Sequence, residues 1–140
     1  MSERILKALM QLFAIIADPK SNTQDRRPVV ESFLKNQLNS ELVDEYLGVF
    51  DYYYAIHQQK NKSKIKSKKR TSSSSVRVLM ICTEINKELT QKQKIIVVIR
   101  LLEFINSGEE ITKQEHEFVS TVANTFNIKS DEYEGLKDFA

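Results

Sequence analysis

The chain has 140 residues and a formal net charge of +2, with 41% hydrophobic and 29% charged residues. This length suits one domain with a single core, and the composition is ordinary for a globular protein. The near balance of charge gives no general attraction to nucleic acid or anionic lipid. Three glycines and two prolines are few for a turn-rich all-β fold. Cys82 is the single cysteine, so no disulfide forms within the chain, which fits a reducing compartment.

Residues 3–17 predict an amphipathic helix rather than a signal peptide. Polar side chains recur at helical spacing at Arg4, Lys7 and Gln11, whereas the core of a signal peptide is apolar all round. No apolar run approaches the roughly 20 residues that a membrane-spanning helix needs. The sequence therefore predicts a soluble domain that begins with a helix.

Apolar periodicity predicts six further helices, which gives an all-α bundle of about seven helices. They cover, in chain order, residues 25–38, 40–58, 75–89, 91–106, 113–126 and 131–139. The helix over 91–106 is apolar on nearly every side, so we expect it to be central.

Capping signals mark the start of several of these helices. Thr90 with Gln93, and Thr112 with Glu115, have the spacing of a capping box, in which each residue bonds the backbone of the other. Ser40 stands at a cap position of the third helix, and Ser130 stands at that of the last.

Residues 59–74 (QKNKSKIKSKKRTSSS) interrupt the helical pattern with seven basic residues and one apolar residue. Such a segment buries too little surface to order itself, so we expect a disordered or mobile linker. It separates a first half, 1–58, from a second half, 75–140, within one domain. The halves share a weak pattern at an offset of 89 residues, which aligns Thr23 with Thr112 and predicts two pseudo-repeated halves.

Ile111, Thr112 and Glu115 match a turn that usually reads Asp-Gly-x-Ile-Ser/Thr-x-x-Glu. On these residues the second half resembles the TerB-like (tellurite-resistance B-like) helical domain, which is all-helical and built from a duplicated unit. Gly108 and Glu109 depart from the family's Asp-Gly. In the first half, Arg26 stands where the family has the glutamate.

The whole chain, with its opening ILKALMQLFAIIAD and its basic-serine segment, is similar to the N-terminal region of large bacterial ABC transporters. That likeness implies a fragment of a longer protein, cytoplasmic and at the inner face of the membrane. It implies a non-catalytic regulatory or interaction module that contacts other domains of its parent or a protein partner. No phosphate-binding loop of the GxxxxGK[ST] type is present, so this segment is not itself predicted to be an ATPase, and no cofactor is expected.

The acidic turn offers a candidate metal site at Glu109, Glu110 and Glu115, beside His116 and Glu117. Hard cations need several converging oxygens, which such a turn could supply. The structural reading is that Glu115 completes a capping box and the other two favour a helix N-terminus. Because the family pattern is broken in both halves, we assign no metal. A metal-responsive stress module remains the alternative function.

Two further features are candidates for interaction. Lys66, Lys68, Lys69 and Arg70 belong to the basic segment, which could be a solvated linker, contact anionic lipid, or bind nucleic acid. The absence of interleaved aromatic residues disfavours nucleic acid.

The three consecutive tyrosines at 52–54 cannot all face inward on one helix. One or two of them, with Tyr52 and Tyr53 as candidates, should be exposed or meet a partner. The remaining reactive residue types give no catalytic set. His57 and His116 have no nucleophile at a recognisable spacing, and Cys82 lies on an apolar stripe that predicts a core position.

Overall fold

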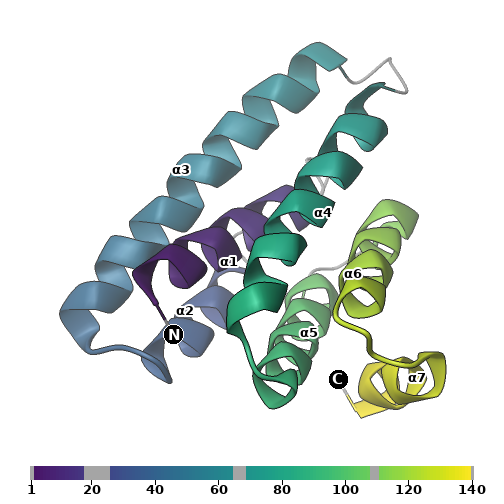
Figure 1. The fold of residues 1–140 in the computed structure, drawn as a ribbon. Helices are drawn as coiled ribbons and strands as arrows, with labels where there is room; N and C mark the ends of the chain where they lie inside the picture. The colour runs from purple at the N-terminus through teal and green to yellow at the C-terminus, as the bar shows by residue number, and fades with distance from the viewer. Residues whose placement is uncertain (1, 18–25, 65–68, 108–110, 140) are drawn as a thin grey trace.

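The structure is a computed structural model that describes residues 2–17, 26–64, 69–107 and 111–139, with 58–64, 69–74 and 139 described by their backbone alone. These residues form seven α-helices and no strand, which confirms the predicted all-α class (Figure 1). The helices are α1 (Glu3–Ile16), α2 (Arg27–Lys35), α3 (Ser40–Lys64), α4 (Lys69–Glu88), α5 (Gln91–Asn106), α6 (Lys113–Thr125) and α7 (Ser130–Phe139).

Helices α3 and α4 reach further into the basic-serine segment than the sequence predicts. The pattern indicated an end near residue 58 and a start near 75, but α3 continues to Lys64 and α4 begins at Lys69. The connection between them is residues 65–68, which lie outside the described part of the chain. The longer helices form an arm that extends past the other helices in Figure 1.

The most deeply buried helix is α1, not α5, so the prediction that 91–106 is central is wrong. Nine of the 14 residues of α1 are buried, and this helix packs against α3, α4 and α6. In α5 the apolar residues do not all face inward, since the Ile96 side chain is 38% exposed. Hydrophobic composition around a whole helix therefore did not identify the most buried helix.

Both predicted capping boxes are confirmed. The Thr90 hydroxyl accepts from the Gln93 amide while the Gln93 side chain accepts from the Thr90 amide, and Thr112 and Glu115 repeat the arrangement. The prediction for Ser40 is wrong, because the Asn39 side chain accepts from the Leu42 amide and so caps α3. Asparagine and serine are about equally good caps, so the sequence did not separate the two positions.

The order of the helices follows the offset found in the sequence. Shifting α1, α2 and the start of α3 by 89 residues places them on α5, α6 and the start of α7, with α4 between the two sets. Helix α4 packs against α1 of the first set and α6 of the second, so it joins them. No helix in the described part of the chain is both long enough and apolar enough to cross a membrane.

Candidate functional site

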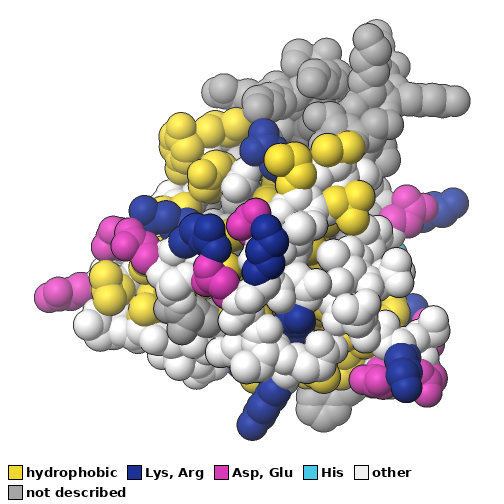
Figure 2. All heavy atoms as spheres, in the orientation of Figure 1, with side chains coloured by type: hydrophobic (Ala, Val, Ile, Leu, Met, Phe, Trp, Pro, Cys, Tyr) yellow, Lys and Arg dark blue, Asp and Glu magenta, His cyan; other side chains and the backbone are white. Residues whose placement is uncertain are grey.

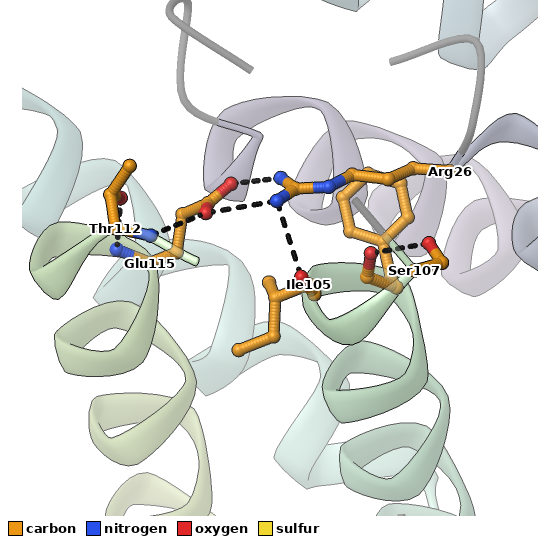
Figure 3. A network of polar contacts seen from close by, with 6 residues as sticks. Arg26, Ile105, Ser107, Thr112 and Glu115 are labelled. Atoms are coloured by element: carbon orange, nitrogen blue, oxygen red, sulfur yellow. Dashed lines mark hydrogen bonds and ion pairs between the residues drawn. The ribbon is translucent and has the colours of Figure 1, made fainter. Parts of the chain in front are cut away.

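A buried ion pair joins the two halves at equivalent positions of the repeat. The Arg26 guanidinium pairs with both oxygens of the Glu115 carboxylate, and both side chains are 0% exposed (Figure 3). These residues are 89 apart, which is the offset of the repeat. The pair therefore joins the two positions that the predicted repeat aligns.

The surroundings of this pair satisfy both charges. Arg26 Nη2 also donates to the Ile105 carbonyl at 3.2 Å, and its guanidinium lies 5.7 Å from the centre of the Phe104 ring. Glu115 Oε1 accepts from the Thr112 amide at 3.0 Å as part of the capping box, at the positive end of α6. A buried charge is tolerated only with such partners, so the pair specifies how α2 meets α5 and α6.

This arrangement bears on the candidate metal residues. The oxygens of Glu115 are engaged by Arg26 and by the Thr112 amide. Glu109 and Glu110 lie outside the described residues. Among the residues that are described, no group of three or more His, Cys, Asp or Glu side chains is placed to hold a metal ion. The assignment of no metal at this turn stays a prediction, as does the metal-responsive alternative.

The outer face of α4 is the most apolar exposed surface of the described helices. Val76, Leu79 and Met80 are 57%, 45% and 62% exposed, on the side of α4 opposite the buried Val78, Cys82 and Ile85. The apolar periodicity of residues 75–89 predicts Leu79 on the inward face together with Val78, Cys82, Ile85 and Leu89, and for Leu79 that prediction is wrong. A helix that packs on one side normally presents polar residues on the other. Helix α4 does not, so this face, Val76–Leu79–Met80, is a candidate binding surface.

A groove of about 390 Å³ runs beside this face, between α1 and α4. Its apolar lining comes from Ile5 and Ala8 of α1 and from Met80 and Ile81 of α4. Arg4, Gln11, Arg77, Thr83 and Glu84 supply its polar lining. Figure 2 shows hydrophobic side chains gathered over α3 and α4, with charged side chains of both signs gathered below them. An apolar strip beside a groove with a polar rim is the usual form of a protein-binding surface.

Charged side chains at one end of this groove form ion pairs and hydrogen bonds with one another. Arg4 pairs with Glu84 at 3.5 Å and also with Glu88, and the Ser2 hydroxyl donates to Glu88 at 2.9 Å. The hydrogen bonds from Ser2 and Arg4 hold the pKa of the Glu88 carboxyl below its usual value. Arg77, by contrast, takes no part in the ion pairs found among the described residues.

The tyrosine prediction agrees with the structure in its geometry. Tyr52 is 63% exposed, Tyr53 and Tyr54 are half-buried, and the Tyr52 and Tyr53 rings meet edge-on at 5.4 Å. Whether these two rings bind a partner stays a prediction. Of the basic candidates, Lys66 and Lys68 lie outside the described residues, while Lys69 and Arg70 begin α4, where only the backbone is described.

A second hollow, of about 790 Å³, lies between α6 and α7. Its lining is polar and includes His116, Lys113, Glu117 and Lys137, with Tyr133 at its base. His116 is exposed there. This depression is larger than the groove, but Tyr133 is the only large apolar side chain among the described residues of its lining, so it excludes water from a ligand less well and is the weaker candidate.

Cys82 lies in the core, as its position on an apolar stripe predicted. The side chain is 0% exposed, and burial raises the pKa of its thiol from 9.0 to about 12. Reactive cysteines instead have lowered pKa values and partial exposure. Cys82 is therefore a packing residue and not part of a site.

The sequence did not indicate the outer face of α4 as a binding surface, and it favoured the tyrosines of α3 and the basic segment. A signal was present, since six of the seven residues from Val76 to Cys82 are apolar and so surround the whole helix. Such a run does not reveal which side of the helix the fold covers.

The chain was compared with protein-family models, with curated proteins and with solved structures. No protein-family model, no curated protein and no solved structure matches it.

Proposed function

We propose that this chain is a non-catalytic protein-interaction module that binds an amphipathic helix on the outer face of α4. The single observation that carries the proposal is the exposed strip Val76–Leu79–Met80 beside the groove to α1. Apolar side chains at this spacing fit the apolar side chains of a facing helix, and peptide helices are commonly bound in such grooves. The affinity would come from Met80 and Leu79 as central contacts, with the charged groups as a rim.

The family and the parent protein of this chain are also part of the proposal, and they follow from its resemblance to TerB-like domains and to the N-terminal region of ABC transporters. We propose a TerB-like domain that acts as the N-terminal module of an ABC transporter, at the cytoplasmic face of the membrane. The seven-helix order, the offset of 89 residues and the turn residues Ile111, Thr112 and Glu115 support it. An ATP-binding motif and hydrophobic spans encoded after Ala140 in the native reading frame would be expected. A reading frame that encodes neither would contradict the transporter assignment.

Photo-crosslinking in the native host tests the binding surface. A photoreactive amino acid in place of Met80 should give a defined covalent adduct, whose partner is identified by mass spectrometry. The matched control is the same substitution at Ser120, an exposed residue in the middle of α6. Equal labelling at both positions, or no adduct at Met80, would contradict the proposed function.

A further inference from the structure

We infer that the partner helix is α4 of a second copy of this chain, packed antiparallel. This inference rests on the proposed function and names its occupant. Val76, Leu79, Met80 and Thr83 are exposed on the side of α4 that lies opposite its buried residues. Their spacing is the same read in either direction, so an antiparallel copy places Val76 opposite Thr83 and Leu79 opposite Met80. A twofold interface brings the same patch of both copies together, so each residue of the strip must fit the residue that it meets.

The charged side chains beside this strip would also pair between two antiparallel copies, because one is basic and the other is acidic. Arg77 and Glu84 both line the groove side of α4, Arg77 two residues before Leu79 and Glu84 four residues after Met80. In an antiparallel pair, residues on one flank of the first helix meet residues on the same flank of the second. With a rise of about 1.5 Å per residue, Arg77 of one copy and Glu84 of the other are offset by about 3 Å along the axis, which an arginine side chain spans. Arg77 forms no ion pair among the described residues, whereas Glu84 already pairs with Arg4 and Lys87 of its own chain, so Arg77 of the second copy would join that exposed cluster.

The charge along the chain favours antiparallel over parallel pairing. Between Asp51 and Glu84 the sequence carries eight basic residues and no acidic residue. The first half of α4 belongs to this basic stretch, whereas Glu84 and Glu88 lie in its second half. Parallel helices would bring the two basic ends together, and like charges repel. Antiparallel helices bring each basic end towards the acidic end of the other copy.

Sedimentation equilibrium of the whole chain over a wide concentration range tests the inference. The chain should form a dimer, and Met80→Glu should raise the dimer dissociation constant at least about tenfold, because it places two carboxylates near the twofold axis. Ser120→Glu, which adds the same charge on α6, should leave association unchanged. A chain that stays monomeric up to millimolar concentration, or a dimer that Met80→Glu does not weaken, overturns the inference.

Disulfide trapping tests the orientation. In a Cys82→Ala background, Val76→Cys mixed with Thr83→Cys should form the mixed disulfide faster than Val76→Cys alone forms its own. Faster trapping of Val76→Cys with itself would show a parallel pair and overturn the antiparallel assignment. The two proposals fail separately. If the chain is monomeric but a photoreactive group at Met80 labels another protein, the proposed function stands and the inference of a second copy fails. If Met80 gives no adduct, the proposed function itself fails.

Discussion

Two places in this molecule reverse the usual rule of apolar inside and polar outside. At the junction of the halves, Arg26 and Glu115 are charged and fully buried. On α4, Val76, Leu79 and Met80 are apolar and about half exposed. The first reversal is compensated within the chain, because each charge finds the other together with backbone and ring contacts. The second finds no compensation among the described residues, which is why we propose that this face binds a partner.

The largest expected effect comes from breaking the buried pair. Glu115→Gln keeps an oxygen for the Thr112 amide but leaves Arg26 charged and buried, so the free energy of unfolding should fall by about 3–5 kcal/mol in urea titrations. Adding Arg26→Met should recover most of this loss, since the pair then carries no charge. Arg27→Gln is the surface control: it breaks an exposed pair with Asp51 and should cost less than about 1 kcal/mol. If Glu115→Gln and Arg27→Gln lower the free energy of unfolding equally, the buried pair contributes no more to stability than the exposed pair.

The two faces of α4 should respond very differently to truncation. Ile85→Ala removes a side chain that is 0% exposed and should cost about 2–5 kcal/mol of unfolding free energy. Met80→Ala, at 62% exposure, should change it by no more than about 0.5 kcal/mol. Both are measured by thermal and urea unfolding at a concentration where the chain is monomeric. A large cost for Met80→Ala under those conditions would mean that Met80 serves the core rather than a partner.

The free energy of unfolding should fall at alkaline pH because the Cys82 thiol is buried. The folded pKa of its thiol lies above the unfolded value of 9.0, so its contribution to stability is complete below that pH and is lost as pH rises toward about 12. Between pH 9 and 10 the free energy of unfolding should fall, by at most about 1.4 kcal/mol per pH unit from this group. Cys82→Ala should remove this slope. The pKa values of Tyr46 and Tyr133 are also raised, mainly by burial, and they affect stability only above about pH 10.

The smallest effect is expected from divalent cations. A ligand that binds only the folded state raises the midpoint of thermal unfolding. Because Arg26 and the Thr112 amide engage the Glu115 oxygens, Ca²⁺ or Mg²⁺ should leave the midpoint unchanged. A rise at micromolar ion would favour the metal-responsive alternative, and Glu109→Gln with Glu110→Gln would then have to abolish it.

Much of the fold could be predicted because its signals are local. The two capping boxes depend on residues three positions apart, and the helices follow from apolar periodicity, so neither requires knowledge of the tertiary structure. The ends of α3 and α4 were less predictable, because lysine and serine do not show whether a helix continues once its apolar pattern stops. The exposed strip on α4 was missed for a related reason: a helix that is apolar on every side does not reveal which side will be covered.

The sequence by itself determined the seven helices, the core position of Cys82 and the offset of 89 residues, because each depends on spacing along the chain. Only the tertiary structure decided that Arg26 meets Glu115, that α1 rather than α5 is most buried, and that α4 leaves Val76, Leu79 and Met80 exposed. These three facts depend on which helix faces cover one another. That choice is made by the packing of residues far apart in the sequence, and no local pattern encodes it.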